Sequence, residues 1–225
     1  MQLAKVIAEG KPLVYFDEAS FNLWLRNRKT WTPSDDPIKY PLGRNRGKGI
    51  TVMGAISQHL GKPLFTLETS TNGSAFMEFL IKLRQRFPLK STRVTIVLDN
   101  HKAHRTADVS ALAKKLNFQF MFMPPYSPEF NCIEALWGVL KKDFKRRVLE
   151  QRKVEISDDL FRQLLEESLN AVKPKVQQHA ARYNNRGYMH LITGKVMNRG
   201  NDFVEETLEE VPELEDSDSI DEEIK

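Results

Sequence analysis

The chain has 225 residues, of which 40% are hydrophobic, and this length and composition favour one well-packed domain with an appendage. No run of about 18 apolar residues is present, which excludes a membrane-spanning helix. The single cysteine, Cys132, excludes an intramolecular disulfide and a cysteine-rich zinc site.

The net charge of +4 conceals two oppositely charged parts of the chain. Residues 204–225 hold 11 Asp and Glu against one Lys, whereas residues 1–203 hold 33 Lys and Arg against 19 Asp and Glu, a net charge of +14. A body this basic attracts polyanions, nucleic acids first among them, although a solvated basic surface without a partner explains the charge equally well. Repulsion between like charges predicts that residues 204–225 form a disordered acidic tail.

Apolar periodicity and turn residues predict the order of elements along the chain. We expect strands at 12–17, 50–57, 63–69, 93–100 and 118–123, the second and third forming a hairpin. We expect helices at 74–87, 106–116, about 133–144, 157–172 and 173–184. The stretch 22–48, rich in Arg, Lys, Pro and Gly, is expected to be a basic loop.

This order predicts an α/β fold with a mixed central sheet flanked by helices, because a helix between two apolar strands favours a right-handed crossover. It resembles the ribonuclease H-like fold. The expected organisation is one such domain over residues 1–184 that includes a helical C-terminal extension, a linker over 185–203 and the acidic tail.

Three acids lie at positions where a fold of this kind binds its ligands. Asp17 and Asp99 each follow an apolar run, and carboxyl ends of strands line the ligand crevice of open α/β sheets. Glu134 lies beside the apolar stripe of a helix that follows a proline-rich loop. Carboxylates suit Mg²⁺, and two such ions cleave phosphodiesters by activating water and stabilising the leaving oxygen. From the residues alone, ordinary surface acids explain the pattern equally well.

Four motifs resemble those of the mariner-type DDE transposase superfamily, which includes related bacterial insertion-sequence transposases. They are DEASF (17–21), ITVMGAIS (50–57), VLDNHKAH (97–104) and MPPYSPEFNCIEALWGVLKK (123–142). The last matches a family pattern of the form PPYSPxxNxIE. The 34 residues between Asp99 and Glu134 also match the spacing of one large branch of the superfamily.

The resemblance implies a Mg²⁺-dependent enzyme that cuts DNA and joins strands in cut-and-paste transposition. It implies Asp17, Asp99 and Glu134 as catalytic ligands of two metal ions, with Mn²⁺ able to substitute and Asp99 bridging both. It also implies DNA partners, namely transposon ends and target DNA, and a homodimer or higher assembly on them. Glu129 competes with Glu134 for the third position, but it occupies a place that the family varies.

Further residues are candidates for contacts with DNA. Asn100 and His104 fit the family's Asp-Asn-x-x-x-His pattern, although a solvent-exposed histidine at a helix start explains His104 equally well. Arg and Lys side chains bind phosphates, and indole rings stack on bases. The alternative explanation of these residues is a basic surface without a nucleic-acid partner. The basic and aromatic candidates are Arg26, Arg28, Trp31, Arg44, Arg46, Lys48, Lys141 and Lys142.

The family's helix-turn-helix modules, which recognise transposon ends, are not found before the first expected strand. We therefore expect a fragment, a truncated reading frame or a separately supplied recognition module. The rival functions are a domesticated transposase that binds DNA without cutting it and a ribonuclease H-like nuclease. The acidic segment favours a eukaryotic host and a nuclear location; a bacterial host would place the protein in the cytoplasm or nucleoid.

Overall fold

The computed structural model describes residues 2–23, 49–68, 70–87, 92–124, 130–151 and 156–174. The expected helix at 173–184, the linker and the acidic segment lie outside these residues, apart from the first two positions of that helix. None of the described helices is both long and apolar enough to cross a membrane.

Five strands form one mixed sheet, as the sequence predicts. The strands are β1 (Leu13–Phe21), β2 (Ile50–Ile56), β3 (Leu64–Glu68), β4 (Val94–Leu98) and β5 (Phe118–Phe122). Their order across the sheet is β3-β2-β1-β4-β5. The β1–β2 and β2–β3 pairs are antiparallel, and the β1–β4 and β4–β5 pairs are parallel. The expected hairpin is therefore confirmed.

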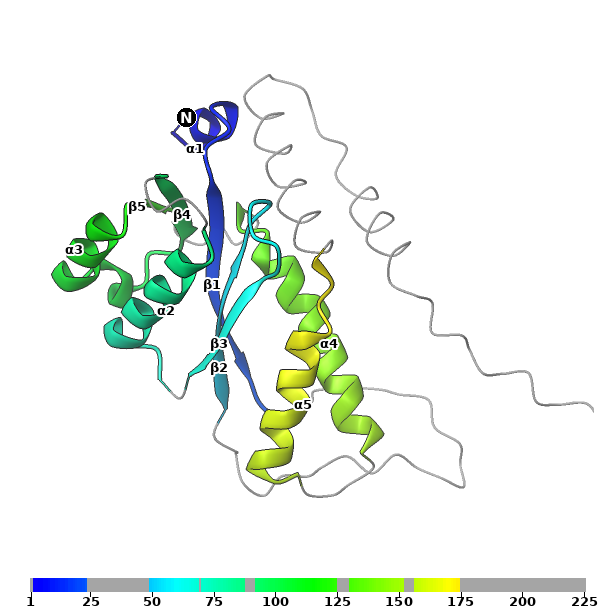
Figure 1. Ribbon diagram of the computed structural model, residues 1–225. Coiled ribbons are helices and arrows are strands. Elements are labelled where there is room, and N and C mark those ends of the chain that lie inside the picture. The colour runs from blue at the N-terminus through cyan, green and yellow to red at the C-terminus, as the bar shows by residue number, and fades with distance from the viewer. Residues whose placement is uncertain are drawn as a thin grey trace, which may run out of the picture.

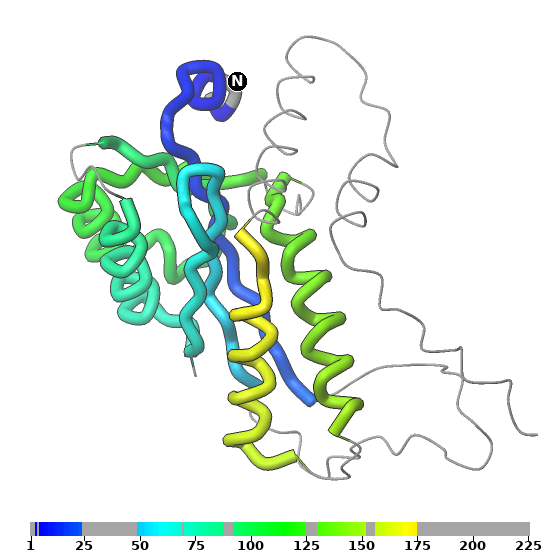
Figure 2. Tube along the Cα trace, turned by 45° about the vertical axis from the view of Figure 1, so that its right-hand side comes forward, coloured from blue at the N-terminus to red at the C-terminus, as the bar shows by residue number. Residues whose placement is uncertain are grey.

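Helices cover both faces of the sheet (Figure 1). Helices α2 (Gly73–Gln85) and α3 (Ala107–Lys115) lie on one side, whereas α4 (Ile133–Glu150) and α5 (Asp158–Asn170) lie on the other. The view in Figure 2 separates the two layers in the same way. Two short elements were not expected from the sequence, the helix α1 (Gln2–Ala8) and the 3₁₀ helix η1 (Lys102–Arg105).

Side-chain caps explain where three of these helices begin. Asn72 accepts a hydrogen bond from the backbone N–H of Ala75 at α2, and Thr106 and Ser157 do the same at α3 and α5. Each cap satisfies one backbone donor that the first helical turn leaves without a partner. The ends of the predicted helices are therefore set by local polar residues as well as by apolar periodicity.

The alternation of side chains along β1 divides the core into two. Leu13 and Tyr15 pack with α4 and α5, whereas Val14 and Phe16 pack with α2 and α3. Successive side chains of a strand point to opposite faces. The adjacent acids Asp17 and Glu18 therefore point to opposite layers, which decides how the acidic site is built.

Gly54 of β2 allows a close approach between the sheet and α4. A Cβ atom at this position would lie 2.5 Å from Cη2 of Trp137 and 2.7 Å from its Cζ2. Both atoms belong to a buried indole ring, so the ring has little room to retreat. The glycine in the motif ITVMGAIS is thus a packing requirement of α4.

We expect Gly54→Ala to lower the free energy of unfolding by about 1–3 kcal/mol, as overpacked cores do. Urea unfolding of the variant and the wild type measures the difference. Gly61→Ala is the control, because a Cβ there meets nothing within 4 Å. Equal stabilities of Gly54→Ala and the wild type would contradict the packing argument.

Candidate functional site: an acidic cluster between two helical layers

Asp17 lies within β1 and not at its end, which corrects the expectation from the sequence. The strand continues to Phe21, because its second half still pairs with β2. The parallel pairing with β4, however, extends only as far as Tyr15 and Val97. Continuing that register by two residues leads from Asp17 to Asp99, just past the end of β4. The two acids therefore lie at matching positions where the two strands part.

Trp137 of α4 holds the Asp17 carboxylate. Its Nε1 donates a hydrogen bond to Asp17 Oδ2 at 3.2 Å. The indole is 2% exposed and packs against Phe21 and Phe65, so Trp137 is a core residue. The same ring also fixes the orientation of a charged side chain, a role that sequence reasoning missed.

Glu134, in the first turn of α4, brings a second negative charge to this side of the sheet. Its side chain is exposed. Burial, followed by the charge of Glu134 and smaller contributions from Glu18 and Asp99, raises the pKa of Asp17 to about 7. Burial is the largest cause of this shift, and the neighbouring carboxylates add a negative field that a divalent cation would offset.

Asn131 ties the end of the proline-rich loop to β1. Its Nδ2 donates to the backbone oxygen of Phe16 at 3.1 Å, and the side chain is 3% exposed. Residues 125–129, which include Tyr126 and Glu129, lie outside the described part of the chain. The anchor places the start of α4, and with it Glu134, beside the residue that precedes Asp17.

On the other face, His104 lies between two carboxylates. Its Nε2 is 3.0 Å from Glu18 Oε1, and its Nδ1 is 3.1 Å from Asp99 Oδ1. The ring is fully buried and packs on Phe16 and Phe76. Burial opposes protonation of the imidazole, but the two carboxylates outweigh it and raise the pKa of His104 to about 9. His104 is thus a buried cation beneath the site, and it presents no surface to DNA.

Asp99 joins the two faces of the site. His104 lowers the pKa of Asp99, and the backbone N–H of His101, which donates to Asp99 Oδ1 at 3.0 Å, acts in the same direction. One ligand atom each from Glu18, Asp99 and His104 lie within 4.8 Å of one another. While both nitrogens of the imidazole are protonated, the ring cannot bind a metal. The carboxylates are then the ligands that the site offers.

Glu18 is the site residue that sequence reasoning missed. The signal was present, because Glu18 follows Asp17 directly and strand alternation places consecutive side chains on opposite faces. Its partner could not be inferred, because His104 belongs to η1, an element that the apolar pattern does not predict.

Asn100 connects the ends of two parallel strands. Its Nδ2 donates to the backbone oxygen of Met123 at 2.6 Å, and Arg105 donates to its Oδ1. Arg105 also lies over the ring of Phe122, 4.6 Å from the centroid. Both polar atoms of the Asn100 amide, which the sequence proposed as a DNA contact, are therefore engaged within the protein.

Of the basic DNA-contact candidates, only those on α4 lie among the described residues. Residues 24–48, which contain the aromatic and arginine candidates of the basic loop, fall outside them. Lys141 and Lys142 are exposed. Since α4 rises about 1.5 Å per residue, Lys141 lies two turns, or about 10 Å, beyond Glu134 on the same side of the helix.

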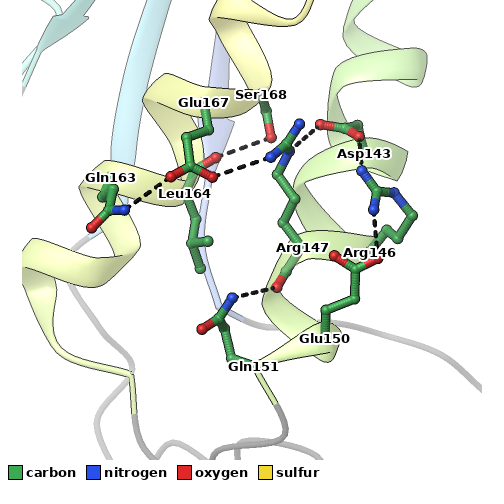
Figure 3. A network of polar contacts seen from close by, with 9 residues as sticks. All are labelled: Asp143, Arg146, Arg147, Glu150, Gln151, Gln163, Leu164, Glu167 and Ser168. Carbon is green, nitrogen blue, oxygen red and sulfur yellow. Dashed lines mark hydrogen bonds and ion pairs between the residues drawn. The ribbon is translucent and has the colours of Figure 1, made fainter.

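The next two arginines of α4 are engaged with acids of the protein itself (Figure 3). Arg146 and Arg147 each bind Asp143 at 2.7 Å, and Arg147 also reaches Glu167 of α5 at 3.1 Å. Burial opposes ionisation of Asp143, but the two guanidinium groups lower its pKa. Arg147 thus joins α4 to α5, whereas Arg146 pairs with acids of α4, so neither arginine extends the exposed basic surface of the two lysines.

The fold has clear counterparts among solved structures. A Mos1 transposase paired-end complex with a left transposon end matches with a TM-score of 0.62 and 16% identity, over 86% of this chain and 59% of that chain. The catalytic domain of Mos1 mariner transposase matches with a TM-score of 0.58 and 15% identity, over 87% and 90% of the two chains. At these identities the likeness establishes the fold, which is the expected ribonuclease H-like one.

Sequence comparison supplies the family. Residues 12–156 match the family described as DDE superfamily endonuclease, and the chain therefore belongs to it. An uncharacterised 39 kDa protein of insertion element IS630 from Shigella sonnei is 24% identical over 136 residues, which are 60% of this chain and 39% of that protein. The chain thus spans well under half the length of this curated relative.

The raised pKa of Asp17 has a consequence for stability. The folded chain keeps this proton up to about pH 7, whereas the unfolded chain loses it near 3.8. The folded state therefore binds more protons between these values, and Asp17 makes the free energy of unfolding fall as the pH rises through this window. We expect Asp17→Asn to match the wild type near pH 4 and to exceed it in stability at pH 8, without divalent metal.

Thermal unfolding of both proteins across this pH range, in a chelating buffer, measures the effect. The difference between them isolates Asp17 from the titration of His104. Asp108→Asn, an exposed acid of α3, serves as the control and should follow the wild type. A wild type that gains stability over Asp17→Asn as the pH rises would contradict the predicted sign.

Proposed function

We propose that this chain is the catalytic part of a metal-dependent DNA transposase, which hydrolyses phosphodiester bonds and then joins DNA strands. The observation that carries the proposal is the half-buried Asp17 carboxyl beside the other acids, where burial first and then the charges of Glu134, Glu18 and Asp99 raise its pKa to about 7. Membership of the DDE superfamily endonuclease family supports the same chemistry.

The donor set fits a hard divalent cation. Mg²⁺ prefers carboxylate oxygens and keeps several waters, and Asp17, Asp99 and Glu134 supply such oxygens. We propose two bound ions, which would lower the pKa of a water and stabilise the leaving 3′ oxygen. Asp99 is our choice for the residue that faces both ions, because it lies between the Asp17 side and the Glu18 side of the site. Structures of the Mos1 catalytic domain with Mg and with Mn support both metals.

The protein's own residues orient this chemistry. Trp137 keeps the Asp17 carboxylate in place, and His104 does the same for Asp99 and Glu18. In the first step a water oxygen bonds to phosphorus, and the 3′ oxygen leaves and takes up a proton as a hydroxyl. In the second step the oxygen of that hydroxyl loses its proton and bonds to phosphorus of a target phosphodiester, whose own 3′ oxygen leaves and takes up a proton. Groups that hold metal ligands in this way commonly contribute about 10–100-fold to activity or metal affinity.

The substrate and assembly are inferred by likeness. The similar solved structures include a Mos1 complex with a transposon end and a Mos1 strand transfer complex. For this chain we propose transposon ends and target DNA as substrates and a homodimer or higher assembly on them. Recognition of the ends would come from a separate module. The +14 charge of residues 1–203 supports a polyanionic substrate.

The acidic triad is tested by replacing its members one at a time. We expect Asp17→Asn, Asp99→Asn and Glu134→Gln each to lower Mn²⁺-dependent nicking of duplex DNA by more than about 100-fold, since removing a ligand costs more than removing its support. Nicking of a labelled duplex is measured beside Mn²⁺-induced stabilisation, which should also disappear. Glu78→Gln, an exposed acid of α2, should retain both.

Two other outcomes have definite meanings. Wild-type protein that binds DNA but shows neither nicking nor carboxylate-dependent metal binding would identify a DNA-binding protein without catalysis. Preferential cleavage of an RNA–DNA hybrid would identify a ribonuclease H-like nuclease. Either result would overturn the transposase proposal.

We propose that the exposed lysines of α4, Lys141 and Lys142, bind DNA phosphates beyond Glu134. We expect the double variant Lys141→Gln/Lys142→Gln to weaken binding to duplexes of any sequence, and to reduce the slope of log affinity against log salt by about 1 for each phosphate that is no longer bound. Fluorescence anisotropy over a salt series measures both. Lys114→Gln/Lys115→Gln on α3 is the matched control, and an equal effect of the two double variants would show that only total charge matters.

A further inference from the structure

An open cleft follows the edge strand β3, away from the acidic triad. The strand pairs with β2 on one side, and no described strand pairs with its other edge. Two hollows of about 490 and 320 Å³ adjoin this edge and share Phe65, Leu67 and Arg86 in their walls. One is also lined by Lys82 of α2 and Arg162 of α5, so the edge lies on the floor between the two helical layers.

The floor of this cleft presents hydrogen-bonding groups of the β3 backbone that an occupant could pair with. Along an edge strand, alternate backbone N–H and C=O groups point outward, where they can pair with another extended segment. The Thr66 side chain, 8% exposed, lines the same cleft, and its buried Oγ1 has no hydrogen-bond partner among the described residues.

The charges around the cleft favour an acidic occupant. Its walls carry four cations against two acids, and one of the cations, Arg162, lies 3.8 Å from an acid of its own helix, Glu166. Between the charges lie partly buried apolar side chains of β3. The charged wall residues are Lys62, Lys82, Arg86, Arg162, Glu68 and Glu166.

We propose that the occupant is the acidic segment of the same chain, residues 204–225, docked along β3. This segment has 11 acids and one Lys, with Leu208, Val211 and Leu214 among them, a composition that matches a cationic cleft with an apolar floor. Val172, near the end of α5, already lines the cleft. The 29 residues between Pro174 and Val204 can span up to about 100 Å, so the segment can reach the whole edge.

The proposal is independent of the metal chemistry, and it gives the acidic segment a role in place of the disorder expected from its charge. Docking along β3 covers an edge with which no described strand pairs and which would otherwise invite pairing with other chains. DNA satisfies the charges of the cleft but not the outward backbone groups of β3.

Hydrogen–deuterium exchange of residues 64–68 in the full chain tests the proposal. The comparison is with a full-length variant in which the 11 acids of residues 204–225 are replaced by Asn and Gln. We expect exchange at β3 to become at least about tenfold faster in the variant, and to slow again when a synthetic peptide of residues 204–225 is added. Unchanged exchange would overturn the proposal.

Variants of the cleft provide the second arm. We expect Lys82→Gln/Arg86→Gln to accelerate exchange at β3 as the variant acidic segment does. Lys114→Gln/Lys115→Gln, which removes two cations from the end of α3, should have no effect. Protection that rises with protein concentration would assign the cleft to a second copy of the chain. Protection of the acid-depleted variant by duplex DNA would assign the cleft to DNA. Either outcome would overturn the proposal.

Discussion

The mutual repulsion of carboxylates, held together by the fold, is the constraint on which this structure depends. Asp17, Asp99 and Glu134 would separate if their backbones were free, because like charges at short range resist joint ionisation. The sheet places Asp17 within β1 and Asp99 just past the end of the neighbouring β4, and α4 brings the third. The free energy gained by burying the two apolar cores is what keeps this unfavourable cluster assembled.

The two helical layers restrain the cluster by different chemistry. On the α4 side, a neutral indole donates one hydrogen bond to Asp17 and leaves its negative charge uncompensated. On the opposite side, the buried His104 compensates Glu18 and Asp99. The site thus has a cation-deficient half and a neutralised half, and Asp99 belongs to both. Under the proposed function, this asymmetry would favour a metal ion on the side of Asp17 and Glu134.

Much of this arrangement was predictable from the sequence. Apolar runs located all five strands, and the motifs located Asp99 and Glu134. The extent of β1 was not predictable. The strand continues through Asp17 and Glu18 without an apolar run because its edge still pairs with β2 there. Burial of His104 was not predictable either, since it depends on a short 3₁₀ helix. The engagement of Arg147 with Glu167 required the packing of α5 on α4, which no local pattern reveals.

The contact between Gly54 and Trp137 has a consequence for how relatives of this chain can vary. The glycine at position 54 and the indole at position 137 depend on each other, because the ring occupies the space that a Cβ would need. A relative with a larger residue at 54 requires a smaller ring at 137, and then has no indole nitrogen to orient the first acid. Substitutions at these two positions should therefore be inherited together, and a lineage that has changed the pair has changed how it holds Asp17.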